Sequence, residues 1–357
     1  MTSAQKITPD QTDFPPAPAD EAALEEALSL PTARLCRDFA ALEGDILVLG
    51  AGGKMGPSLA RMARRALLAA GRGSQRVIAV ARFSDPAARA LLDAAGVETL
   101  AADLSDRSQV ASLPDAANIV FMAGQKFGTT DAPENTWMMN TYVPALAAER
   151  FASAKRLVAF STGCVYPNVS AKSGGSREGD VTEPLGDYAN SCVGRERLFT
   201  YFAKKNGVPT TLFRLNYAVD LRYGVLVDIA RKVKNEEPVD VTMGYANVIW
   251  QGDANAQALQ SLLHAAVPPL ALNVTGAEIL SVRALADQFG KRFGVTPRIF
   301  GEEAPTALLS NPERAYNLLG TPTLPLGTLI QWVGDWLMQG NRLLNKPTHY
   351  ETRDGKY

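Results

Sequence analysis

Three glycines near residue 50 carry the clearest chemical signal in the sequence. They are spaced as Gly50-x-x-Gly53-x-x-Gly56, after an apolar run at residues 46–49 and before a helical pattern. Glycines at this spacing allow a tight turn, a close approach of the backbone to a pyrophosphate, and close packing of the helix on its strand. The helix N-terminus adds free N–H groups and the positive end of its dipole. The stretch therefore predicts a dinucleotide site; the alternative is a glycine turn with a purely structural role.

The end of the next expected strand bears on which dinucleotide binds. An NAD-binding unit usually carries an acidic residue there for the ribose 2′-hydroxyl, whereas a 2′-phosphate requires an arginine nearby. Here the strand at 77–81 is followed by Arg82, Phe83 and Ser84, with no acid. We therefore predict NADP as the cofactor, with NAD as the alternative. The other interpretation of Arg82 is an ordinary surface arginine.

These residues need a sheet and helices to position them. Short apolar runs alternate with helical patterns, and the expected strands cover residues 46–49, 77–81, 97–101, 118–123, 157–161 and 210–215. Strands separated by helices predict a parallel sheet covered on both faces. The predicted fold class is α/β, with a doubly wound parallel Rossmann sheet over residues 45–220 to which 246–275 returns.

The remaining segments are less regular. Residues 221–245 and 276–345 are expected to form a smaller C-terminal substrate-binding region. Residues 1–44 form an N-terminal extension, disordered over about its first 20 residues, that either caps a sheet edge or joins an oligomer interface. Residues 346–357 are polar, and we expect this tail to lie on the surface.

The composition narrows the functional classes. The chain has 357 residues, of which 46% are hydrophobic and 20% charged, and its formal net charge is −1. This balance gives no global attraction to nucleic acid or to an anionic membrane. Three cysteines without a CxxC pair and two distant histidines predict no metal site. No apolar run reaches the roughly 18–20 residues of a membrane helix, so we expect a cytoplasmic protein with a small-molecule substrate.

Several further motifs follow the glycine turn in a fixed order. They are Asp103-Leu104, Met122-Ala123-Gly124-Gln125-Lys126, Asn140, Ser161-Thr162-Gly163-Cys164-Val165-Tyr166, Tyr188, Trp250-Gln251-Gly252-Asp253 and Asn273-Val274-Thr275-Gly276. Over about residues 45–340 the chain resembles the extended short-chain dehydrogenase/reductase family, also called the NAD-dependent epimerase/dehydratase family. Together with the turn and the strand end, the resemblance implies cofactor contacts at Gly50, Gly53, Lys54, Met55, Gly56, Arg82, Asp103, Leu104, Ala123, Gly124, Lys126 and Asn140.

The resemblance also implies that Thr162 and Tyr188 are the catalytic residues. Hydride transfer at a carbon that bears oxygen needs a group that exchanges a proton with that oxygen. A tyrosine can do this when a nearby cation lowers its pKa from about 10. The Thr162 hydroxyl would orient the same oxygen.

The sequence departs from the family at one position of this motif, which reads Tyr188-Ala189-Asn190-Ser191-Cys192. In the family a lysine stands where Cys192 stands here, and it supplies the cation and holds the nicotinamide ribose. The chain is therefore an atypical member. Arg195, Lys126 and the oxidised nicotinamide ring are the candidate sources of positive charge, and we expect Cys192 to pack passively.

Two residues after the sixth strand are predicted to bind substrate. Asn216 and Arg222 follow strand 210–215 at the carboxyl end of the expected sheet, where ligands bind in open α/β folds. Asn216 lies near the place of a family asparagine that reaches the substrate. Arg222 would hold a carboxylate or phosphate, or alternatively form a salt bridge between domains.

We predict an NAD(P)-dependent oxidoreductase, epimerase or dehydratase that acts by hydride transfer on a carbohydrate-like substrate, such as a nucleotide sugar or a sugar acid. A non-catalytic NAD(P)-binding sensor or assembly subunit is the alternative. Lyase or isomerase chemistry without net redox change is a third hypothesis. Expected helices at 136–154 and 188–206 match the pair that forms the dimer interface of many relatives, which implies a homodimer.

Overall fold

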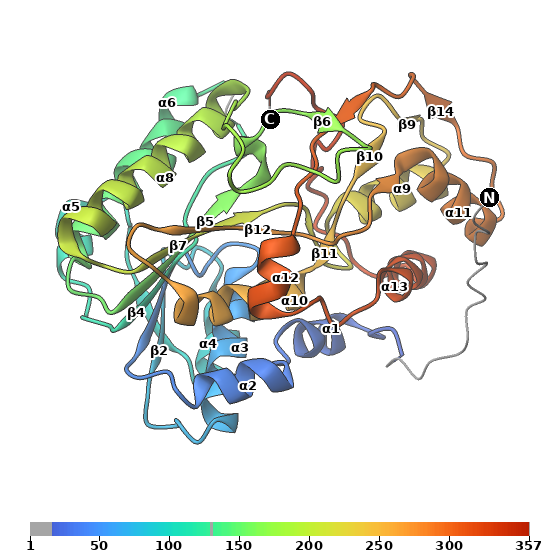
Figure 1. Ribbon diagram of the computed structural model, residues 1–357. Coiled ribbons are helices and arrows are strands. Elements are labelled where there is room, and N and C mark those ends of the chain that lie inside the picture. Colours follow the sequence, from blue (N-terminus) through green and yellow to red (C-terminus); the bar gives the residue numbers. More distant parts are fainter. Residues whose placement is uncertain (1–15, 129–130, 357) are drawn as a thin grey trace.

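A seven-stranded parallel sheet lies at the centre of the computed structural model, which describes residues 16–128 and 131–356 (Figure 1). Most of the segment expected to be disordered lies outside the described residues. The strand order is β12-β7-β5-β4-β1-β2-β3, and every neighbouring pair is parallel. The strands are β1 (Ile46–Leu49), β2 (Val77–Ala81), β3 (Glu98–Ala101), β4 (Asn118–Phe121), β5 (Arg156–Thr162), β7 (Thr210–Leu215) and β12 (Leu270–Val274). The predicted fold class is confirmed.

The order of the strands fixes where a ligand can bind. From β1 the chain moves outward through β2 and β3, then returns to the other side of β1 to form β4. In a doubly wound sheet, ligands bind at this switch point, beyond the carboxyl ends of the strands. The glycine turn follows β1, and the loop that begins with Met122 follows β4. Both loops therefore lie at the same edge of the sheet.

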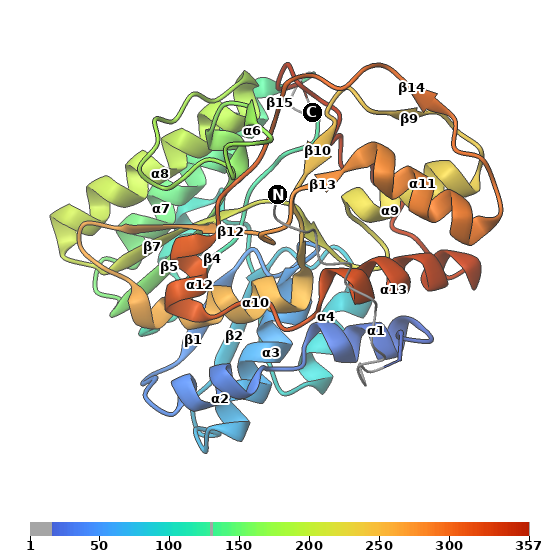
Figure 2. The ribbon, with the colours of Figure 1, turned by 45° about the vertical axis from the view of Figure 1, so that its right-hand side comes forward.

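Helices cover both faces of the sheet (Figures 1 and 2). One layer contains α2 (Ala33–Phe39), α3 (Gly56–Ala69), α4 (Pro86–Ala94), α10 (Gln251–Gln260), the 3-10 turn η3 (Ser261–His264) and α12 (Glu313–Leu319). The opposite layer contains α5 (Arg107–Ala111), α6 (Pro133–Trp137), the π-helical turn η1 (Met138–Tyr142), α7 (Val143–Arg150) and α8 (Gly186–Asn206). Each layer buries its apolar side chains against the sheet.

The helix expected at 136–154 is interrupted by the π-helical turn η1. Pro144 stands near the start of α7, and a proline lacks the N–H that would bond the carbonyl four residues earlier. That earlier residue is Asn140, so the proline accounts for the wider turn around it. The sequence predicted the helical path correctly, but it did not predict the widened turn on which the site depends.

A second apolar core lies beyond the carboxyl edge of the sheet. It is formed by α9 (Val225–Lys234), α11 (Val282–Phe293) and α13 (Leu326–Met338), with α1 (Glu21–Leu28) of the N-terminal extension. Short strands pair around it: β6 (Val169–Ser170) with β15 (Thr306–Ala307), β8 (Ala218–Val219) with β11 (Ile249–Trp250), β9 (Val239–Asp240) with β14 (Ile299–Phe300), and β10 (Tyr245–Ala246) with β13 (Leu280–Ser281). The extension packs on α3 and α10 through α1 and α2, so these two helices do not cap a sheet edge.

The prediction that the polar tail lies on the surface is wrong for three of its residues, Thr348, Tyr350 and Gly355. Tyr350 is 1% exposed and packs in the second core, and its hydroxyl donates to the Asp240 carbonyl at 3.3 Å. Thr348 is also buried, because its backbone N–H and its hydroxyl both bind the Asp228 carboxylate, at 2.8 and 2.6 Å. We call residues 345–356 the C-terminal strap.

Within the part of the chain that the structure describes, no helix combines the length and the apolar character needed to cross a membrane.

Candidate functional site

The three glycines of the turn meet different physical demands. Gly50 has φ +89°, and a Cβ there would lie 2.6 Å from the Ala123 nitrogen. A Cβ on Gly56 would lie 2.3 Å from the Ala51 carbonyl oxygen. Gly53 is exposed, and its nearest non-neighbouring atom would be 3.5 Å from an added Cβ. The fold therefore requires glycine at 50 and 56, whereas at 53 an absent side chain leaves room for a ligand.

The helix that follows the turn fits a dinucleotide pyrophosphate. Its N-cap residue, Met55, makes no side-chain hydrogen bond to the first N–H groups of α3. Such N–H groups, together with the helix dipole, form an anion site. The open face of Gly53 and the uncapped N-terminus of α3 thus form one cradle.

Opposite charges lie at the end of β2 and β3. The Asp103 carboxylate accepts hydrogen bonds from the N–H and the hydroxyl of Ser105, at 2.9 and 2.7 Å. These bonds and the nearby charge of Arg82 lower the pKa of Asp103. Arg82 is exposed and Leu104 is buried. This edge can therefore offer both a carboxylate and a guanidinium to an adenosine group.

Asn140 holds the loop after β4 by hydrogen bonds from within the core, and it does not line the cleft. It is fully buried, donates to the Gln125 carbonyl at 2.9 Å and to the Ser191 hydroxyl at 3.0 Å, and accepts from the Gln125 N–H at 3.0 Å. The amide therefore joins this loop to α8. Its predicted contact with the cofactor becomes indirect, through the loop that carries Ala123, Gly124 and Lys126.

A cleft of about 170 Å³ opens where the sheet meets the second core. Its lining residues come from the glycine turn, the loop after β4, β5, α8, the segment after β7 and the strap: Lys54, Met55, Lys126, Ser161, Thr162, Cys164, Tyr188, Leu215, Asn216, Tyr217, Ala218, Tyr223, Gly224, Val225 and Thr348. The cleft joins predicted cofactor residues to the predicted catalytic pair and to Asn216. Arg82 and Asp103 lie outside it.

Thr162 and Tyr188 meet in this cleft. The Thr162 hydroxyl accepts from the Cys164 N–H at 3.1 Å and hydrogen-bonds the phenol of Tyr188. Burial and the thiols of Cys192 and Cys164 raise the pKa of Tyr188 well above its usual 10, whereas Thr162 and Arg195 oppose this shift. Tyr188 is thus a neutral phenol at physiological pH and can donate a hydrogen bond to a substrate oxygen.

Comparison with protein families gives a match between residues 46–242 and the model of the NAD dependent epimerase/dehydratase family. This match covers more than half of the chain. The chain belongs to the NAD-dependent epimerase/dehydratase family. The family resemblance predicted from the motifs is confirmed. Among curated proteins, no sequence gives a significant match.

Solved structures share the fold at low identity. The UDP-glucose 4-epimerase of Thermotoga maritima, solved with UDP-glucose, has a TM-score of 0.67 at 16% identity over 83% of this chain and 99% of its own. The UDP-glucose 4-epimerase of Thermus thermophilus, solved with NAD, has a TM-score of 0.67 at 18% identity over 82% and 98%. MoeE5 in complex with UDP-glucose and NAD has a TM-score of 0.67 at 19% identity over 83% and 99%.

Cys192, which replaces the family lysine, is a neutral part of the core. It is fully buried and packs against Val165 and Tyr166, and burial raises its pKa to about 11. A thiol in this state is neither a cation nor an activated nucleophile. Cys192 therefore does not supply the cation that the family resemblance implies at this position.

Two lysines line the cleft. Lys126 donates to the Thr348 carbonyl at 3.0 Å, and its ammonium lies 6.0 Å from the centre of the Tyr188 ring. Burial lowers the pKa of Lys126. The Lys54 ammonium lies 3.5 Å from the centre of the Tyr223 ring, a cation–π contact. Lys54 therefore connects the glycine turn to the substrate side of the cleft.

The two predicted substrate residues have different surroundings. Asn216 lines the cleft and donates to the Asn247 side chain at 2.9 Å. The Arg222 guanidinium instead binds the carboxylates of Asp220 and Glu25, each at 2.8 Å. These partners hold Arg222 in a salt bridge between the N-terminal extension and the second core, which corrects its predicted role in substrate binding.

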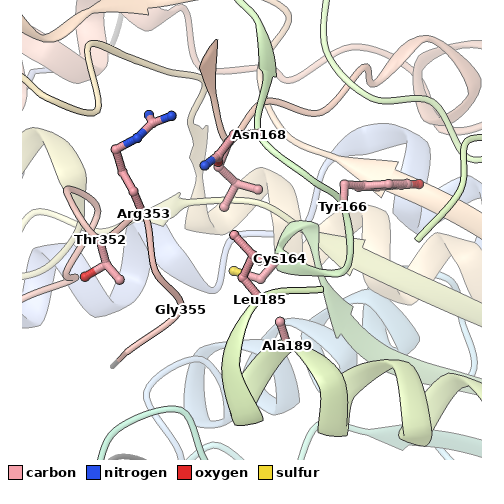
Figure 3. Close-up of a pocket in the computed structure, with 9 residues that line it drawn as sticks. Cys164, Tyr166, Asn168, Leu185, Ala189, Thr352, Arg353 and Gly355 are labelled. Carbon is pink, nitrogen blue, oxygen red and sulfur yellow. The ribbon is translucent and has the colours of Figure 1, made fainter. Parts of the chain in front are cut away.

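The cleft contains residues that the sequence did not single out. Tyr217 and Tyr223 come from the segment after β7, and the only sequence feature that pointed to this segment was its hydrogen-bonding side chains. Thr348 comes from the strap, and no sequence feature pointed to it. Figure 3 shows Thr352, Arg353 and Gly355 of the strap across a second, smaller pocket from Cys164 and Leu185.

The C-terminal strap contacts β15 and the start of α8. Arg353 donates to the Thr306 carbonyl at 2.6 Å. A Cβ on Gly186 would lie 2.2 Å from the Gly355 carbonyl oxygen, so the strap backbone touches the first turn of the helix that carries Tyr188. The end of the chain is thus part of the wall around the site.

Proposed function

We propose that this family member transfers a hydride between NADP(H) and a carbon that bears a hydroxyl or carbonyl group in a carbohydrate-like substrate. The observation that carries the proposal is the single cleft that joins the glycine turn to Thr162 and Tyr188. A phosphate cradle and a proton-exchanging pair in one cleft are the two parts that this chemistry requires.

Each part has a defined task. The turn at Gly53 and the N-terminus of α3 would hold the pyrophosphate, and Arg82 would pair with a 2′-phosphate. The bound dinucleotide supplies the hydride acceptor or donor. Thr162 would orient the reacting oxygen while Tyr188 exchanges a proton with it, and Asn216 would contact the substrate.

The solved relatives support a nucleotide sugar as substrate. Two of them are UDP-glucose 4-epimerases, and MoeE5 was solved with UDP-glucose and NAD. A sugar acid is the other substrate class that the proposal includes. NAD in MoeE5 and in the Thermus thermophilus epimerase supports a nicotinamide dinucleotide here, and Arg82 supports the phosphorylated form.

Turnover of Tyr188→Phe and Thr162→Ala tests the proposal. Turnover would be followed with a panel of UDP-sugars and hexuronic acids, together with the absorbance of bound reduced nicotinamide. We expect both variants to lose turnover, because each removes a hydroxyl at the reacting oxygen. Ser112→Ala is the matched control, since it also removes a hydroxyl but from an exposed residue outside the cleft. Wild-type rates in the two site variants would rule out the assigned roles.

The neutral Cys192 favours a second candidate, a non-catalytic NAD(P)-binding sensor or assembly subunit. Under that alternative the wild-type protein binds a dinucleotide without turning over any substrate of the panel. Cys192→Lys discriminates the two, because gain of turnover only in this variant would indicate an enzyme that has lost its activity.

We also propose that the protein is a homodimer. Trp137, Tyr142 and Tyr201 are exposed aromatic side chains on α6, η1 and α8, the layer that corresponds to the dimer interface expected from the resemblance. Sedimentation equilibrium tests this, and a monomer at high protein concentration would contradict it.

A further inference from the structure

The guanidinium of Arg195 is buried without a carboxylate partner among the residues that the structure describes. The side chain is 6% exposed. It donates to the Phe160 carbonyl at 2.9 Å and to the Asn140 side-chain oxygen at 2.5 Å, both neutral acceptors. Its Nε–H has no acceptor within the described residues. A buried charge that is not paired is costly, so this arrangement needs an explanation.

The neighbouring acid does not neutralise Arg195. Glu196 follows it in sequence, but its carboxylate binds the Arg214 guanidinium at 2.9 and 2.7 Å and accepts from the Ser161 hydroxyl at 2.6 Å. Glu196 and Arg214 thus form a buried ion pair with each other. The positive charge of Arg195 remains uncompensated by any described carboxylate within 4 Å.

Arg195 lies on the face of α8 that carries the reaction site. Tyr188, Cys192 and Arg195 are spaced by four and three residues, which places them on one side of a helix. A Cβ on Gly124 would lie 2.5 Å from the guanidinium, so the loop after β4 passes directly over it. The charge therefore lies against the loop after β4, on the same face of α8 as Tyr188.

We propose that Arg195 supplies the positive charge that the motif lysine supplies in other members of the family, and that it acts on Tyr188 from beneath the cleft. The inference rests on the proposed function for its role in turnover. Arg195 is a positioning residue, because it is covered by Gly124 and does not reach the substrate. The replacement explains how Cys192 is tolerated in a site that keeps Thr162 and Tyr188.

The electrostatics agree with this geometry. Arg195 acts to lower the pKa of both Tyr188 and Cys192. The other charged or titratable groups around this part of α8 include Cys164, Tyr166, Cys192, Lys126 and the Glu196–Arg214 pair. Lys126 is in turn influenced by Cys164, Cys192, Asp228 and Glu351.

The charge matters when Tyr188 ionises. In the reductive direction the Tyr188 O–H proton passes to the substrate carbonyl oxygen, and the C=O bond becomes a C–O single bond as a C–H bond forms. The hydride, with its electron pair, would come from the reduced dinucleotide. Arg195 stabilises the phenolate that remains on Tyr188, and it does so without touching the reacting atoms.

The test is the ionisation of residue 188 in the cofactor-free protein. Tyr188 is replaced by a trifluorotyrosine, whose phenol ionises several pH units below that of tyrosine, and its pKa is read by fluorine NMR. Arg195→Met should raise this pKa by about one unit or more, because a nearby opposite charge is lost. Arg195→Lys should leave it close to the wild-type value, since the charge is kept. Arg197→Met is the matched control, because Arg197 is exposed on the same helix.

A second variant keeps the test decisive if Arg195→Met folds poorly. Arg195→Met combined with Cys192→Lys returns a cation to the motif position, and we expect the pKa of residue 188 to fall again. Equal pKa values in wild type and folded Arg195→Met would overturn the inference, as would equal shifts in Arg195→Met and Arg197→Met.

The failure of this inference is distinguishable from that of the proposed function. Turnover by the wild type with no change in the pKa of residue 188 would reject the role of Arg195 alone. A shifted pKa in a protein that turns over no sugar would reject the proposed function and leave the electrostatic role in place.

Discussion

The two ends of the cleft are built in opposite ways. At the dinucleotide end, Gly50, Gly53 and Gly56 and the start of α3 form the cradle within one short stretch. At the reaction end, residues of β5, α8, the loop after β4 and the strap converge from distant parts of the chain. Within the glycine turn, Gly50 and Gly56 cannot be replaced without disturbing the backbone around them. At the reaction end, whose residues come from several elements, the positive charge can be supplied from a different position, as we infer for Arg195.

Two buried arginines, Arg195 on α8 and Arg214 on β7, also differ in how their charges are surrounded. Arg214 is closed into an ion pair with Glu196, whereas Arg195 binds only neutral acceptors. We interpret the first as structural and the second as electrostatic.

The largest effect on stability should come from Arg214→Met. Removing one partner of a buried pair leaves Glu196 uncompensated and typically costs about 3–5 kcal/mol. Arg195→Met removes only neutral hydrogen bonds and should lower the free energy of unfolding by about 1–2 kcal/mol. Denaturant unfolding measures both. Equal losses would contradict the distinction between the two arginines.

Gly53→Val should weaken dinucleotide binding by about 100-fold, or roughly 3 kcal/mol, because its side chain would fill the space left for the phosphates. Its thermal midpoint should stay close to that of the wild type, since no protein atom would be crowded. Titration calorimetry with NADP and NAD gives the affinity. Gly179→Val, at an exposed and uncrowded glycine elsewhere, is the control and should bind normally.

Arg82→Ser should reduce the preference for NADP over NAD by about tenfold, which corresponds to about 1.4 kcal/mol for a lost phosphate contact. Affinities for both dinucleotides are needed, because the prediction concerns their ratio. Arg107→Ser, at another exposed arginine, should leave the ratio unchanged. An unaltered ratio in Arg82→Ser would make Arg82 an ordinary surface residue.

The smallest effect should come from Thr348→Val in the strap. The change keeps the shape of the side chain but removes the hydroxyl bond to Asp228, at a cost of about 1 kcal/mol. Because the Thr348 carbonyl holds Lys126, KM should rise more than kcat falls. A normal KM in a variant with the expected loss of stability would show that the strap serves folding alone.

The sequence predicted well what depends on neighbouring residues. Strands buried on both faces are continuous apolar runs, such as β1 with all four residues buried, so the sheet could be recognised. The glycine turn carries its own steric requirements. Thr162 and Tyr188 could be placed by their motifs, and the structure brings them into contact.

The sequence did not predict what depends on tertiary packing. Thr348 and Tyr350 lie in a polar stretch, and only the contacts with Asp228 and the second core bury them. The substrate role predicted for Arg222 was overridden by carboxylates from distant positions. Asn140 was placed near the cofactor, but its bracing role depends on the π-helical turn.

The most direct test of the central claim is the fate of the hydride. The protein with bound oxidised dinucleotide is mixed with sugars that carry deuterium at the reacting carbon, using the same panel of UDP-sugars and hexuronic acids. The dinucleotide is then recovered and analysed by mass spectrometry. We predict one deuterium on the nicotinamide of the rapidly quenched wild type and none in Tyr188→Phe. Turnover in which the deuterium is lost to solvent while the nicotinamide stays unlabelled would contradict hydride transfer at this site.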